Sequence, residues 1–260
     1  MKKIFVLIIF IVFSYAKNNS INICDDNAGW APYSYLNKNK KVSGFSIALI
    51  KEIFKRLNMQ PHIDMIPWKR CVYLVEHFDK THKYEMFLDG SYSKERAQKY
   101  YQSLPIYYTH QALFYSDKKF NKQEIKNIIK NNINKLKMCD VNGYQTEHYK
   151  KVLGYTRNID KSAQSTFMVL KKISKGRCDA IVCSQEPIYG GNMIEQFHLP
   201  KDIKRIELKQ YKPIAFYIWV AKTSPRGKEL ITKINKVLEE MKKDGTYQKL
   251  YKKYVLDEME

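Results

Sequence analysis

The chain has 260 residues, of which 44% are hydrophobic, and its formal net charge is +20. This much apolar material can form a packed core, which excludes a wholly disordered chain. No apolar run approaches the roughly 20 residues that span a bilayer, so we do not expect an integral membrane protein. At about 150 residues per domain, the length predicts one large or two modest domains.

Residues 1–16 have the pattern of a secretory signal. Lys2 and Lys3 precede the apolar stretch 4–13, and Ser14-Tyr15-Ala16 supplies small residues at a signal-peptidase site. Cleavage after Ala16 leaves 244 residues with a charge of +18 and predicts export to the periplasm. A buried N-terminal strand or a membrane anchor is the alternative.

The chain has five cysteines, all after the predicted signal. Disulfides are permitted in an oxidising compartment. The sequence has no Cys-x-x-Cys pair and its six histidines are scattered, so we predict no metal site. Because five is odd, at least one thiol stays unpaired or pairs between chains.

Strand and helix patterns alternate in the first part of the mature chain. Strands are expected at 21–24, 62–66, 84–88 and 106–115, the last rich in aromatic residues. Ser46 can cap one helix, Pro67 can start a second, and Ser93 can cap a short third.

A second run of alternating patterns follows residue 137. The Lys-, Asn- and Ile-rich stretch 118–137 predicts a surface helix, and strands are expected at 137–141, 179–183 and 214–221. Helices are expected at 165–175 and after Ser224-Pro225. Two such runs without a low-complexity linker predict an α/β protein of two lobes with mostly parallel sheets.

Four segments, taken in order, resemble the bacterial extracellular solute-binding proteins of family 3, which serve amino-acid ABC importers. The segments are WAPY at 30–33 with VSGFS at 42–46, DGSYSKERA at 89–97, GRCDA at 176–180, and the C-terminal stretch 224–254. The PWKRC sequence at 67–71 narrows the resemblance to a subgroup with that motif.

The resemblance implies a type II periplasmic-binding-protein fold, in which each lobe is a mostly parallel sheet flanked by helices and two strands cross between the lobes. We place lobe 1 at 17–113 with 216–260 and lobe 2 at 114–215. The crossings are expected near 113–115 and 211–215. Any disulfide should stay within one lobe, because a bridge across the cleft would oppose closure.

The resemblance also implies a ligand site in lobe 1. Arg96 matches the arginine that binds a ligand carboxylate, and a planar guanidinium suits that group. Asp89, Gly90 and Ser91 match the loop that offers backbone and hydroxyl groups. A surface position is the alternative for Arg96 in this Lys-rich segment.

Aromatic and basic residues near these motifs are further candidates. Trp30, Tyr33 and Trp68 could stack on the ligand or gate the cleft, or could simply pack in the core. Arg70 could be a second anion contact or a surface charge.

The second lobe departs from the family pattern. Gln145 and Thr146 precede a predicted helix and could bind the ligand, or could form a plain turn and cap. The family usually has an Asp a few residues after the GRxDA segment to bind the ligand's ammonium group, but this chain has Ser184 there. Glu186 is the expected substitute, which leaves the ligand open to be something other than a standard α-amino acid.

The leading hypothesis is therefore a monomeric periplasmic binding protein, without a cofactor, that closes around an amino acid or small carboxylate and is recognised by an ABC permease. One alternative is an enzyme on the same scaffold, such as a dehydratase of a small cyclic acid using Glu186 or His148. Another is the sensing module of a membrane receptor. Nucleic-acid binding is not expected, because the positive charge is dispersed and mostly lysine.

Overall fold

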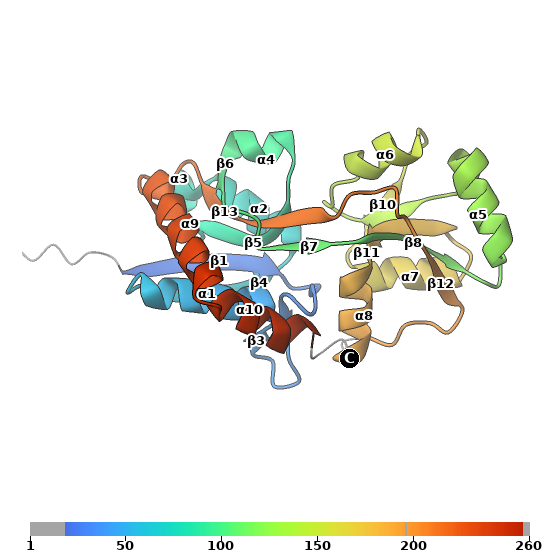
Figure 1. The fold of residues 1–260 in the computed structure, drawn as a ribbon. Helices are drawn as coiled ribbons and strands as arrows, with labels where there is room; N and C mark the ends of the chain where they lie inside the picture. The colour runs from blue at the N-terminus through green and yellow to red at the C-terminus, as the bar shows by residue number, and fades with distance from the viewer. Residues whose placement is uncertain (1–18, 196, 257–260) are drawn as a thin grey trace, which may run out of the picture.

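The structure is a computed structural model that describes residues 19–195 and 197–256, without the side chains of His148, Tyr149 and Met193. Two α/β bodies lie side by side and are joined by extended strands (Figure 1). The predicted signal at 1–16 lies outside the described residues. Within the described part, no helix is both long and apolar enough to cross a membrane.

Lobe 1 is built on one mixed sheet with the order β4-β1-β5-β13-β6, and β7 also pairs with β13. Its strands, with the β2–β3 hairpin beside them, are β1 (Ser20–Asp26), β2 (Tyr35–Leu36), β3 (Val42–Ser43), β4 (Gln60–Ile66), β5 (Met86–Ser91), β6 (Tyr100–Gln102), β7 (Tyr107–Thr109) and β13 (Ile214–Ala221). Its helices are α1 (Phe45–Arg56), α2 (Trp68–Glu76), α3 (Phe78–Thr81), α4 (Lys94–Lys99), α9 (Gly227–Lys243), α10 (Thr246–Tyr251) and the π-helix Lys252–Leu256.

Helix α1 begins where a loop folds tightly over its first turn. Gly44 has a φ of 113°, and a Cβ there would lie 2.3 Å from the carbonyl oxygen of Tyr33. The amides of Phe45 and Ser46 donate to the carbonyls of residues 32 and 33 instead of to a side-chain cap. The expectation that Ser46 caps this helix is therefore wrong, and its hydroxyl donates to Asp89 Oδ1 at 2.5 Å.

Lobe 2 contains a parallel pair and an antiparallel three-stranded sheet in the order β11-β8-β12. Its strands are β8 (Gln111–Ser116), β9 (Cys139–Val141), β10 (Asp160–Ala163), β11 (Ala180–Ser184) and β12 (Ile203–Glu207). Its helices are α5 (Lys122–Asn131), the 3₁₀ helix Ile133–Lys135, α6 (Glu147–Leu153), α7 (Thr166–Ser174) and α8 (Gln185–Met193). A parallel bridge between Met138 and Ala180 links the two sheets.

The predicted two-lobed α/β architecture is confirmed, with one correction. Strands β1, β4 and β5 are parallel, as are β9 and β10, but β8 and β13 run antiparallel to their neighbours. Parallel neighbours need a crossover connection, usually a helix. Because β8 and β13 enter their sheets directly from the other lobe, the lobe 1 sheet is mixed and the three-stranded sheet of lobe 2 is antiparallel, so the sheets are not mostly parallel.

The first crossing between the lobes lies at His110. The aromatic-rich segment predicted as one strand is two, since β7 pairs with β13 in lobe 1 and β8 pairs with β11 and β12 in lobe 2 (Figure 1). The second crossing lies between the end of β12 and the start of β13. The lobe boundaries remain a prediction, and the strand pairing would move the first one from residue 113 to about His110.

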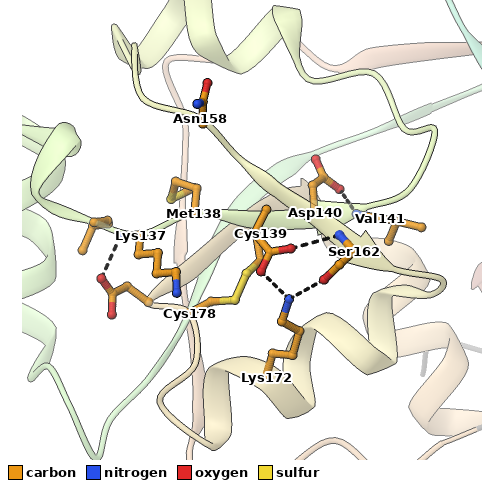
Figure 2. Close-up of a disulfide and its surroundings, with 12 residues drawn as sticks. Lys137, Met138, Cys139, Asp140, Val141, Asn158, Ser162, Lys172 and Cys178 are labelled. Carbon is orange, nitrogen blue, oxygen red and sulfur yellow. Dashed lines mark hydrogen bonds and ion pairs between the residues drawn. A yellow bond between two sulfur atoms is a disulfide. The ribbon is translucent and has the colours of Figure 1, made fainter.

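Each lobe has one disulfide, and neither bridge crosses the cleft, as predicted. Cys24 in β1 bonds to Cys71 in α2, and Cys139 in β9 bonds to Cys178, while Cys183 is in neither bridge. Figure 2 shows the second bridge beside Lys172, whose Nζ lies 2.5 Å from an Asp160 carboxylate oxygen.

The second disulfide also explains a cluster that resembles a metal site. Potential ligand atoms of Cys139, Cys178 and Asp160 lie within 4.8 Å of one another. A disulfide offers no thiolate, however, and Asp160 is already paired with Lys172. The three residues therefore form a structural cross-link with an adjacent ion pair.

The disulfide in lobe 1 should contribute measurably to stability. It closes a separation of 47 residues, and constraining the unfolded chain in this way is worth about 2–4 kcal/mol. We expect urea unfolding to show that the free energy of unfolding of the double variant Cys24→Ala/Cys71→Ala is lower by this amount than that of the oxidised wild-type protein. The control Cys183→Ala should lose much less, and equal losses in both variants would contradict the assignment.

Candidate functional site

A pocket lies between the two lobes and holds about 650 Å³ of empty space, part of it open to solvent. Lobe 1 and its crossing strand contribute Asp25, Asp26, Trp30, Trp68, Asp89, Ser91, Arg96, Ile214 and Phe216. Lobe 2 contributes Gln111, Asp140, Tyr144, Gln145, Val182, Cys183 and Ser184. The site is thus assembled from strand ends and loops of both lobes.

Arg96 is a buried cation in this pocket. The Ser93 hydroxyl caps α4 by accepting from the Arg96 amide at 3.1 Å, and the side chain is held by donating to the Ser91 carbonyl at 2.7 Å. Its guanidinium lies over the Trp68 ring, 5.3 Å from the ring centroid. Burial lowers the pKa of Arg96 from 12.5 to about 10, so it stays charged at neutral pH. The described hydrogen-bond acceptors of its guanidinium are neutral oxygens of Ser91, so none of them supplies a counter-charge.

Four aspartates line the same pocket: Asp25, Asp26, Asp89 and Asp140. Burial raises the pKa of Asp25 well above its usual value, and the nearby Asp89 carboxyl raises it further. Burial also raises the pKa of Asp26 and of Asp89. Asp89 adopts a left-handed φ of 54° inside β5, a conformation that Asp tolerates better than most residues.

Aromatic side chains connect the two walls of the cleft. Trp30 packs on Phe216 of β13 and meets the edge of Tyr144 from lobe 2, with ring centroids 5.5 and 5.9 Å apart. The Tyr144 hydroxyl donates to Asp26 Oδ2 at 3.1 Å. These contacts join the lobes directly, so the structure represents a closed arrangement.

Two glycines let the lobes approach closely at other points. A Cβ on Gly190 in α8 would lie 2.5 Å from the carbonyl oxygen of Ala31 in lobe 1. A Cβ on Gly143 would lie 2.9 Å from the Lys69 side chain. An exposed ion pair, Lys38 with Glu195 at 2.9 Å, adds a third contact.

The pocket contains six of the residues that the sequence suggested as ligand contacts. They are Trp30, Trp68, Asp89, Ser91, Arg96 and Gln145. Arg70 is exposed and lies outside the lining. It is two residues after Trp68 in α2, and side chains with that spacing do not face the same side of a helix.

Tyr33, Gly90 and Thr146 are close to the pocket but do not line it. Tyr33 is fully buried and stacks on Tyr107 with ring centroids 3.7 Å apart. Gly90 accepts from the Trp219 indole at 2.8 Å, and a Cβ there would meet that ring. Thr146 is buried just before the seven-residue helix α6. All three positions are explained by packing.

Glu186 has a structural partner and is not in the lining. Its carboxylate accepts from the His110 amide at 2.9 Å and contacts the His110 ring at 2.8 Å, so it ties down the first crossing. Ser184, where the family has an acidic residue, contacts the Thr109 hydroxyl at 2.7 Å and accepts from the Gln111 amide at 2.9 Å. The His148 side chain lies outside the described residues.

Sequence reasoning did not identify several lining residues, above all Asp25, Asp26, Gln111, Asp140 and Tyr144. The position of Asp25 and Asp26 in the sequence could have identified them, because ligands in α/β folds bind outside the carboxyl ends of parallel strands. Asp25 and Asp26 directly follow the first predicted strand, at 21–24, and are the last two residues of β1. Tyr144 and Asp140 reach the pocket through lobe packing, which no local pattern indicates.

Several solved structures share this fold. An ancestral amino acid-binding protein, AncCDT-1, described as a precursor of cyclohexadienyl dehydratase, is 21% identical with a TM-score of 0.70, covering 92% of this chain and 96% of that one. A histidine kinase sensor domain is 16% identical with a TM-score of 0.73, covering 92% and 96%. A structure on glutathione import through GshT and the cystine ABC importer TcyBC of Streptococcus mutans is 21% identical with a TM-score of 0.71, covering 92% and 95%.

At these identities the likeness shows the fold alone, and no curated protein sequence matches the chain. The family model is more informative, because it spans almost the whole described chain. Residues 21–257 match the bacterial extracellular solute-binding proteins, family 3. Together with the two lobes and the pocket between them, this match shows that the chain belongs to that family of solute-binding proteins.

Proposed function

We propose that the protein is the periplasmic binding component of an ABC importer and that it binds an amino acid or similar small carboxylate in the cleft between its lobes. The observation that carries this proposal is Arg96, a buried guanidinium that lines the pocket and donates to neutral oxygen atoms. A buried charge without a counter-charge is costly, and a ligand carboxylate would supply one. Trp68 beneath the guanidinium keeps it oriented toward the cleft.

Ligand binding would favour closure because the pocket takes side chains from both lobes. A closed form with its ligand is the species that a membrane permease would recognise. The predicted signal at 1–16 supports export. We propose a monomer that binds its ligand without a cofactor. A dehydratase is less well supported, because Glu186, one proposed acid or base, is bound to His110 outside the lining.

Replacement of Arg96 should abolish the carboxylate interaction. Losing a charge-assisted contact in a buried site costs about 2 kcal/mol or more, or roughly a 30-fold rise in Kd. We expect Arg96→Ala to show at least this loss in isothermal titration calorimetry against a panel of L-amino acids and small carboxylates.

The matched control is Arg70→Ala, which removes an exposed arginine from the neighbouring helix and should leave Kd unchanged. Because Arg96→Ala removes a buried side chain, folding must be checked, and circular dichroism should show that both variants are folded. Tight binding that is the same in wild type and Arg96→Ala would refute the assigned site.

Closure can be tested separately at Gly190. An added methyl group would overlap the Ala31 backbone across the cleft, and overpacking of this kind costs about 1–3 kcal/mol. We expect Gly190→Ala to raise Kd roughly 10- to 100-fold. Its melting temperature should not fall, because Ala favours a helix more than Gly.

Gly154 provides the opposite control. It has a φ of 66° and no neighbouring atom within 4 Å of an added Cβ. Gly154→Ala should therefore lower the melting temperature through backbone strain while leaving Kd unchanged. If Gly190→Ala binds as tightly as wild type, the described contact between the lobes is not part of the ligand-bound state.

A further inference from the structure

The charges that line the pocket do not balance. Arg96 is the one cationic side chain in the described lining, whereas four aspartates line it. If a ligand carboxylate pairs with Arg96, no cationic side chain of the described lining is left for Asp25 and Asp89. Buried carboxylates without a counter-charge are as costly as a buried unpaired arginine.

The imbalance is concentrated at Asp25 and Asp89. Both are buried, with 1% and 7% of their surface exposed, and one oxygen of each, Oδ2, has no hydrogen-bond partner among the described residues. The nearby hydroxyls of Ser34 and Tyr107 can turn toward these oxygens, and the two carboxyls lie close enough to hydrogen-bond to each other when one of them carries a proton. These neutral partners satisfy hydrogen bonds but supply no positive charge to the pair.

Gln111 adds an acceptor from the other side of the pocket. It is 5% exposed, its amide nitrogen donates to Ser184, and its Oε1 has no partner in the described part of the chain. The position where the family places an ammonium-binding carboxylate is therefore a neutral serine already engaged by Gln111 and Thr109. The buried pocket acceptors with an unbonded oxygen are therefore Gln111 of lobe 2 and the Asp25 and Asp89 carboxyls of lobe 1.

We propose that the ligand is a net cation, carrying a carboxylate for Arg96 and a further ammonium or guanidinium group that binds the Asp25–Asp89 pair beside Gln111. This inference rests on the proposed function and names the class of its ligand. It also assigns the ligand's carboxylate and this further cationic group chiefly to lobe 1. Lobe 2 then contributes hydrogen bonds and the Tyr144 edge that covers Trp30.

The test uses two pairs of amino acids matched in size and differing in side-chain charge: L-arginine with L-citrulline, and L-lysine with L-norleucine. Titration calorimetry of the wild-type protein should give a Kd at least about 100-fold lower for the cationic member of at least one pair. In Asp25→Asn this ratio should fall below about tenfold, because the amide keeps the shape and removes the charge.

Two further variants make the result specific. Asp89→Asn should reduce the ratio in the same way, and Asn suits the left-handed backbone at that position. Asp117→Asn removes an exposed carboxylate of lobe 2 and should leave the ratio of Kd values between the paired ligands unchanged. Asp25→Asn should stay folded, with a melting temperature at pH 7 no lower than wild type, because burial raises the pKa of the carboxyl that it removes.

Other outcomes separate this inference from the proposed function. If only neutral or acidic members of the amino-acid panel bind in a way that depends on Arg96, the inference of a cationic ligand is overturned. The proposed function as a binding protein then still stands. The cationic ligand is equally overturned if Asp25→Asn and Asp89→Asn keep the wild-type preference between the paired ligands. If no member of the panel binds in a way that depends on Arg96, both proposals fail.

Discussion

The pairing of β13 with β5, β6 and β7 is the interaction on which the rest of the molecule depends. This strand returns from lobe 2 and completes the sheet of lobe 1 by antiparallel hydrogen bonds to three other strands. Its inner residues join the core, where Trp219 is fully buried and donates to the Gly90 carbonyl in β5. Its first residues, Ile214 and Phe216, form part of the pocket wall. One strand therefore fixes the core, the crossing and one side of the site.

The pocket combines opposite charges in an environment that solvates neither well. Arg96 is held by a helix cap, a carbonyl and an indole ring, all from lobe 1. Asp25 and Asp89 lie on neighbouring strands of the same sheet. In water such groups would be screened, but burial makes each depend on a partner. A ligand that supplies both signs of charge would relieve both costs at once.

Local sequence patterns predicted much of the fold and the part of the site that is itself local. Ser93 and Arg96 belong to one helical turn, so a short motif was enough to identify the guanidinium and its cap. Glu186 lies outside the described lining and pairs with His110, which comes from the crossing between β7 and β8. The single strand expected at 106–115 is divided because the chain changes lobes at His110, and no proline or glycine in that segment marks the division. Tertiary partners of this kind leave no mark in the pattern.

The arrangement of tryptophans has an optical consequence. Trp30 and Trp68 line the cleft, and the third tryptophan, Trp219, is fully buried in lobe 1. Separation of the lobes would remove Tyr144 from the edge of Trp30 and hydrate its indole, while Trp219 would keep its surroundings. The intrinsic fluorescence of the unlabelled protein would then shift to longer wavelength on opening and return on closure. The chain thus carries its own spectroscopic reporter at the cleft.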